Sequence, residues 1–290
     1  MQHEIFLHRL HKVFSKIWLK KRSSLITASI LTPFLISCDS ANEIKVVEVC
    51  DKYPTICEQL QEDNWCRVER RDVLVNYYRK EETNDDDYKY KLLLAYEGYA
   101  KCMEKASLIE HKKLKSKKNR RINNHVNALQ HINDLSNETV NSENPLLMYY
   151  HWSRNEDKEA LEKLLQLEGS VLVANPEAQF NYATYYIKKD PNKTFDFLYR
   201  ALELYEKGDK INAEIFMSLA SLFADLKLHK QAYIWLKILE MYDEETEIDH
   251  QKSLEQYQIT YDLNADFLNQ VAKLTLEKIK NGKFQRPNQN

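Results

Sequence analysis

Glycine is scarce in this chain: only four of its 290 residues are glycine. Gly169, Gly208 and Gly282 each follow a run with helical periodicity, where a left-handed C-cap residue is favoured. The sequence is rich in Leu, Lys, Glu, Ala and Tyr, and it shows little of the Val and Ile alternation of a β-strand. We therefore predict an all-α protein that is helical over nearly its whole length.

The same scarcity excludes several kinds of catalytic site. A phosphate-binding loop, a nucleophile elbow and a dinucleotide fingerprint all need closely spaced glycines, and none of these patterns occurs. There is no HExxH motif, and His125 and His131 fall on different faces of a helix. We predict no catalytic residues, metal or cofactor, and a protein that is not an enzyme.

The N-terminus predicts an exported lipoprotein. Six basic residues precede a short apolar run, which ends in Leu35-Ile36-Ser37-Cys38, a pattern typical of bacterial lipoprotein processing. Residues 1–37 would be a removed signal peptide, and acylated Cys38 would anchor the chain to a bilayer on its periplasmic side. Asp39 favours the inner over the outer membrane. The alternative is a signal anchor with Cys38 a free thiol, although the run is shorter than the ~20 residues of a membrane span.

The charge balance gives no reason to expect a nucleic-acid partner. The chain carries 42 Lys and Arg residues against 44 Asp and Glu residues, and most of the leader's charges are basic, so the mature chain is acidic.

Four further cysteines predict two disulfides, for which three pairings are possible. Cys66 and Cys102 lie at equal distances from Asn84 in a polar turn, so an antiparallel helical hairpin would bring them level. We therefore pair Cys66 with Cys102, and Cys50 with Cys57. Zinc binding is the rival interpretation, but the spacings lack a CxxC pair.

The mature chain divides into four predicted parts. Residues 38–61 are a tether, 62–134 a disulfide-stapled helical hairpin region, 145–283 a helical repeat region, and 284–290 a disordered tail. The basic run 112–121 is interpreted as a solvated helix end whose cations suit the C-terminal dipole, with a weaker helix at 122–133. The alternative is a patch that binds a glycan or anionic lipid headgroups.

Paired helices are expected throughout the repeat region. They are predicted at 145–154 with 156–168, 176–189 with 191–206 and 211–227 with 229–243, followed by helices near 248–261 and 264–281. The second and third pairs repeat at an offset of 37 residues, and their large and small positions resemble tetratricopeptide or Sel1-like repeats. The residues that carry the likeness are Phe216, Leu219, Ala220, Phe223, Ala232 and Leu236. The period exceeds the ~34 residues of that family, and its closing proline is absent. The resemblance implies an antiparallel helix-pair solenoid that binds peptides or partner helices.

Five further segments resemble a family of lipoproteins from Gram-negative bacteria that is recognised only as a domain of unknown function. They are residues 64–70, 99–103, 109–115, 149–154 and 231–235. The likeness runs over almost the whole mature chain. It implies export, acylation and a helical repeat, it favours the Cys66–Cys102 pairing, and it implies no activity.

Two groups of residues are candidates for binding a protein partner. Tyr149, Trp152 and Arg154 belong to the densest aromatic cluster, whose alternative role is core packing, with His151 satisfied by a backbone carbonyl. Tetratricopeptide-like register places Phe180, Asn181, Thr184 and Lys188 on the concave side of the next helix pair. We predict a periplasmic adaptor or scaffold for an envelope protein or peptide. The alternative is an envelope enzyme, or its accessory, that acts on peptidoglycan or lipid.

Overall fold

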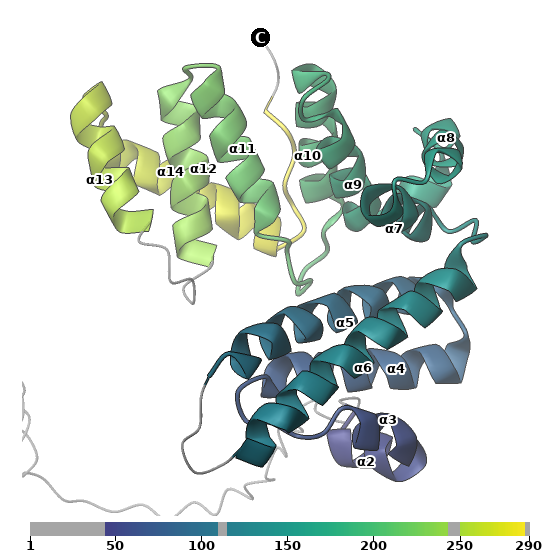
Figure 1. Ribbon diagram of the computed structural model, residues 1–290. Helices are drawn as coiled ribbons and strands as arrows, with labels where there is room; N and C mark the ends of the chain where they lie inside the picture. The colour runs from purple at the N-terminus through teal and green to yellow at the C-terminus, as the bar shows by residue number, and fades with distance from the viewer. Residues whose placement is uncertain (1–43, 110–114, 243–249, 288–290) are drawn as a thin grey trace, which may run out of the picture. The chain divides into compact units, whose positions relative to one another are not determined.

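The computed structural model describes residues 44–109, 115–242 and 250–287 (Figure 1). Residues 1–37, which are predicted to be a signal peptide, and Cys38 and Asp39 lie outside these residues. Over the described ranges the chain forms thirteen α-helices, a short 3-10 turn at Val171–Val173 and no strand, so the all-α prediction is confirmed. In the same ranges, no helix is both long and apolar enough to cross a membrane.

The first half of the described chain is a three-helix bundle of α4 (Arg67–Thr83), α5 (Asp86–Ser107) and α6 (Lys115–Thr139). Helix α5 packs against both of the others (Figure 1). Helix α4 ends at Asn84 in the left-handed conformation, and Asp85 caps α5 by accepting a hydrogen bond from the Asp87 N–H. The structure contains both predicted disulfides, Cys66–Cys102 and Cys50–Cys57. The stapled hairpin is therefore confirmed.

Residues 44–61 are not a tether. They form α2 (Val46–Lys52) and α3 (Pro54–Gln59), and Val49, Ile56 and Leu60 are buried in the core of the bundle. The prediction is wrong here because these apolar side chains and the disulfide between the two helices fix the segment to the bundle.

The basic run does not end a helix. Helix α6 begins at Lys115, so residues 115–121 form its first turns, where cations oppose the helix dipole. The last cation of the run is a core residue. Arg121 is 1% exposed, and it donates hydrogen bonds to both carboxylate oxygens of Asp63, at 2.9 and 3.0 Å, and to the Ala106 carbonyl at 2.7 Å. Part of the run, residues 112–114, lies outside the described residues. The weaker helix predicted at 122–133 is the central part of α6.

Helix pairs fill the second half. They are α7 (Pro145–Asn155) with α8 (Lys158–Gln166), α9 (Pro176–Tyr186) with α10 (Pro191–Leu204) and α11 (Glu214–Asp225) with α12 (His229–Tyr242), followed by α13 (His250–Tyr261) and α14 (Ala265–Lys280). Each lies close to its predicted range. Asn144, Asn175 and Asp190 cap α7, α9 and α10, and each is followed by a proline at the first helical position.

The predicted disordered tail is also wrong over residues 284–287. Phe284 is buried against Tyr199 and Trp235, with ring centroids 6.2 and 6.3 Å away. The Arg286 N–H donates to Glu203 at 3.0 Å. One aromatic ring and this hydrogen bond hold the segment on the helix pairs.

Helix α9 belongs to two hydrophobic clusters. Ala178 and Tyr182 pack into the cluster that contains the bundle, while Ala183 packs into the cluster formed by α10, α11, α12 and α14. This position places the N-terminus of α9 close to α5.

Candidate binding site

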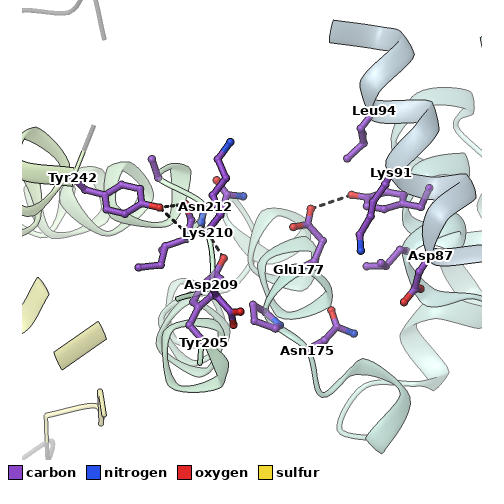
Figure 2. Close-up of a pocket in the computed structure, with 15 residues that line it drawn as sticks. Asp87, Lys91, Leu94, Asn175, Glu177, Tyr205, Asp209, Lys210, Asn212 and Tyr242 are labelled. Carbon is purple, nitrogen blue, oxygen red and sulfur yellow. Dashed lines mark hydrogen bonds between the residues drawn. The ribbon is translucent and has the colours of Figure 1, made fainter. Parts of the chain in front are cut away.

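A pocket of about 780 Å³ lies between α5, the N-terminus of α9 and the segment 205–213 (Figure 2). Its wall combines three tyrosines, charged side chains of both signs and several apolar groups. The lining residues are Asp87, Tyr90, Lys91, Leu94, Leu146, Asn175, Pro176, Glu177, Tyr205, Asp209, Lys210, Ile211, Asn212, Ala213 and Tyr242. An apolar wall with a few placed polar groups is typical of a ligand site.

The first turn of α9 forms one wall of the pocket. Asn175 caps the helix by accepting a hydrogen bond from the Ala178 N–H at 2.8 Å, and Pro176 has no N–H to offer. The Gln179 N–H donates to the Asn175 carbonyl at 3.1 Å. The sequence Asn-Pro-Glu therefore starts the helix and directs the Glu177 side chain into the pocket.

Glu177 lies near the centre of Figure 2, where a dashed line marks the hydrogen bond that its carboxylate accepts. The Tyr90 hydroxyl donates to Glu177 Oε1 at 3.1 Å. Burial raises the pKa of Glu177, and the negative charge of Glu214 raises it further; the bond from Tyr90 and the charge of Lys91 act in the opposite direction without cancelling the rise. Glu177 is thus a half-buried carboxyl group that forms no ion pair with any described residue.

Two phenols hold the opposite wall. The Tyr242 hydroxyl accepts a hydrogen bond from the Ile211 N–H at 2.8 Å and donates to the Ile211 carbonyl at 3.0 Å. The Tyr205 hydroxyl accepts from the Asn212 N–H at 3.0 Å, and burial raises the pKa of Tyr205 to about 12. Because Tyr205 stays protonated at neutral pH, its O–H remains a donor. These bonds fix residues 211 and 212 at the pocket wall.

Asn181 lies one helical turn beyond Glu177 on the same side of α9. It is 3% exposed, and its Nδ2 finds no hydrogen-bond acceptor among the described residues. Burial raises the pKa of Tyr90, and the neighbouring Asn181 amide opposes that rise, so the two side chains lie together. Asn181 therefore belongs to the buried contact between α9 and Tyr90 and does not line the pocket.

A protein family described as proteins of unknown function, DUF2989, matches residues 35–237. The chain belongs to the DUF2989 family. The matched range includes every residue that lines the pocket except Tyr242. No curated protein and no solved structure matches the chain.

The DUF2989 fold brings together some of the predicted partner-binding residues. The Trp152 ring centroid lies 5.6 Å from that of Tyr149 and 5.3 Å from that of Tyr185, and Thr184 neighbours Tyr149 while its hydroxyl donates to the Phe180 carbonyl. The predicted groups on α7 and α9 therefore form one contact between these helices.

The other predicted residues are dispersed. Arg154 forms an ion pair with Glu97, with donor distances of 3.0 and 3.2 Å, and Phe180 packs against the core. Lys188 is exposed beyond the end of α9. The expectation that Asn181 lies in a concave groove and binds a peptide is wrong, because Asn181 is buried beside the Tyr90 side chain of α5.

His151 contacts two side chains, and the Thr139 backbone also interacts with its ring, as the core-packing alternative expected of a backbone group. It is buried, with Nε2 3.1 Å from Thr139 Oγ1 and Nδ1 3.2 Å from Asn155 Nδ2. Burial lowers the pKa of His151, which favours the neutral ring. This cluster ties α7 to α6.

Sequence reasoning missed Tyr90, Lys91, Glu177, Tyr205 and Tyr242. The Asn-Pro-Glu helix start could have drawn attention to Glu177. Its contact with Tyr90 could not be predicted, because the two residues lie 87 positions apart in the chain. Within the described residues, one group of metal-ligand types comes together, Cys66, Glu69 and Cys102, and both of its sulfurs belong to a disulfide.

Proposed function

We propose that this DUF2989 protein is a membrane-anchored periplasmic lipoprotein that acts as an adaptor. Its pocket between α5 and α9 would hold a segment of an envelope protein. The observation that carries this proposal is the pocket itself, into which the half-buried Glu177 carboxylate points without an ion pair to any described residue. A peptide could bind this carboxylate, since a peptide offers an N–H donor at nearly every residue.

The repeat pattern supports a binding role. Helices α9 to α12 form two successive pairs. At the small positions of the tetratricopeptide-like pattern in the second pair, Ala232 is buried and Ala220 is half-buried against the core. Proteins built from stacked helix pairs commonly bind peptides or helices of their partners.

The leader supports the anchor. Leu35-Ile36-Ser37-Cys38 follows a short apolar run, and two disulfides suit an oxidising compartment such as the periplasm. Acyl chains on Cys38 would hold the adaptor at the membrane, with each buried CH₂ contributing ~0.8 kcal/mol. Asp39 favours the inner membrane.

The test is photocrosslinking in intact cells that express the full-length protein from its own promoter. The crosslinker p-benzoylphenylalanine replaces Leu94 inside the pocket or, as control, Val171, which is 89% exposed outside it. We expect one dominant envelope protein to be captured from position 94 only, and its capture to fall when Cys38 is replaced by serine. The same abundant envelope proteins at both positions would refute the adaptor.

A further inference from the structure

We propose that the pocket selects a partner segment with a basic side chain, and that the carboxylate of Glu177 binds the ammonium or guanidinium group of that side chain. This inference rests on the proposed function of the pocket as the partner site. It adds the chemistry that the partner segment must carry.

To infer whether the pocket prefers a cation or an anion, we compare how exposed its charged lining side chains are. Asp87, Glu177 and Asp209 are the lining carboxylates, and Lys91 and Lys210 are the lining cations. Four of these five side chains are exposed, and Glu177 alone is half-buried. Water and salt screen the exposed charges, whereas an interaction with a partly buried charge is several times stronger. Glu177 therefore dominates the electrostatics inside the pocket.

Among the described residues Glu177 also forms no ion pair, although the charge of the exposed Lys91 acts on it. Its one hydrogen bond to a side chain comes from the neutral Tyr90 hydroxyl, and the neighbouring Glu214 carboxylate repels its charge. Burial and this repulsion raise the pKa of Glu177. A ligand cation would reverse both effects, because it replaces lost hydration with a charge-assisted hydrogen bond.

An anionic ligand does not fit the same place, even though the N-terminus of α9 is there. A helix binds anions through the free N–H groups of its first turn. Pro176 has none, and the N–H groups of Ala178 and Gln179 are already bonded to Asn175. The remaining N–H is that of Glu177, whose own carboxylate would repel an anion.

The apolar part of the wall suits the stem of a long basic residue. Leu94, Pro176 and Ile211 line the pocket together with the rings of Tyr90 and Tyr205. Lysine and arginine bury their methylene groups along such surfaces while their charged ends bind a polar group. Tyrosine faces attract cations as well.

The test uses fluorescently labelled peptides Gly-Ala-X-Ala-Gly with blocked ends, where X is arginine, lysine, norleucine or glutamate. They are titrated into the full-length protein in detergent and followed by anisotropy. We expect the arginine and lysine peptides to bind at least tenfold more tightly than the norleucine peptide. Glu177→Gln, which keeps an acceptor for Tyr90, should abolish this difference.

Glu159→Gln is the matched control, because Glu159 is also the second residue of its helix but lies exposed on α8, outside the pocket. It should leave all affinities within twofold of the unmodified protein. Thermal melts of both variants would show that they remain folded. Equal binding of the basic and norleucine peptides, tighter binding of the glutamate peptide, no binding of any basic peptide, or an unchanged preference in Glu177→Gln would overturn the proposal.

The peptide titration and the crosslinking can fail separately. Capture of an envelope protein from position 94, without any preference for basic peptides, would keep the adaptor and remove the charge selection. Selective binding of basic peptides through Glu177, without capture of a partner in cells, would keep the site chemistry and remove the adaptor.

Discussion

At the scale of single residues, the strongest prediction concerns the buried ion pair between Asp63 and Arg121. Replacing Arg121 by methionine leaves the Asp63 carboxylate buried without its counter-charge, which should lower the free energy of unfolding by about 3–5 kcal/mol. Urea denaturation measures the loss. Arg154→Met breaks the more exposed pair with Glu97 and should cost less than about 1 kcal/mol. Equal losses in the two variants would contradict this assignment.

The same pair makes stability depend on pH. Burial alone would raise the pKa of Asp63, but the hydrogen bonds and charge of Arg121 and the bond from the Trp65 N–H lower it below its usual value. The folded-state pKa therefore lies below the unfolded value of about 3.9. The contribution is present above pH 4 and is lost as the pH falls through the folded-state pKa.

We expect the difference in unfolding free energy between the native protein and Asp63→Asn to stay constant from pH 7 to about pH 5. It should shrink as the pH falls below about 4, because the native carboxyl group then becomes protonated too. Denaturant titrations at several pH values measure it. A difference that is independent of pH down to pH 2 would show that Asp63 contributes no charge to stability.

At the scale of helices and loops, the two disulfides should differ in their contribution. The Cys66–Cys102 bond spans 36 residues and joins α4 to α5, whereas Cys50–Cys57 spans only seven. From the entropy of loop closure we expect a loss of about 4 kcal/mol when Cys66 and Cys102 become serine, and about 2.5 kcal/mol for the shorter loop. Urea unfolding of the two double variants checks the order, and a larger loss for Cys50 and Cys57 would refute it.

Gly282 holds the end of α14 against the pocket wall. Its φ is +63°, and a Cβ there would lie 3.1 Å from the Lys207 nitrogen and 3.2 Å from the Tyr205 carbonyl oxygen. Gly282→Ala should therefore destabilise the fold by about 2 kcal/mol or more, because it adds a backbone clash to the left-handed strain. Gly169→Ala is the control. Its φ is +81° and a Cβ there would meet nothing within 4 Å, so this variant should show the destabilisation from the left-handed backbone strain without a clash. Similar thermal unfolding midpoints in the two variants would contradict the clash.

Elements whose signals are local could be predicted, and those that depend on distant contacts could not. The hairpin followed from a polar turn at Asn84 and cysteines equally spaced around it. The starts of α7, α9 and α10 followed from Asn-Pro or Asp-Pro dipeptides. Helices α2 and α3 and the segment after Gly282 were missed because each is held by a few side chains, such as Val49 and Phe284, that reach remote parts of the core.

At the scale of the whole molecule, the pocket could not be predicted either, because it too depends on contacts between residues far apart in the chain. Its walls come from α5, α9 and the segment 205–213, and α9 meets both of the others because it belongs to two hydrophobic clusters. From the sequence alone, Asn175-Pro176-Glu177 predicts only the start of a helix. That Glu177 faces Tyr90 depends on how the bundle packs against the helix pairs, and no local pattern encodes that packing.

The uneven distribution of the core predicts which part of the molecule opens first. Helix α5 buries eight residues in the largest cluster, but α13 buries only His250 and Leu254, and Leu254 packs into a small cluster with Tyr233 and Leu268. Regions with few buried contacts open at lower free energy than the global unfolding. Native-state hydrogen exchange should give α13 an opening free energy at least about 2 kcal/mol below that of α5.

Leu254→Ala sharpens this last prediction. Removing the side chain leaves a cavity in a small cluster, so amide exchange in α13 should accelerate while exchange in α5 stays unchanged. Ile259→Ala, on the same helix but 85% exposed, is the control and should change neither. If Leu254→Ala accelerates α5 and α13 together, the described chain unfolds as one cooperative unit, and the small cluster at its end has no independent stability.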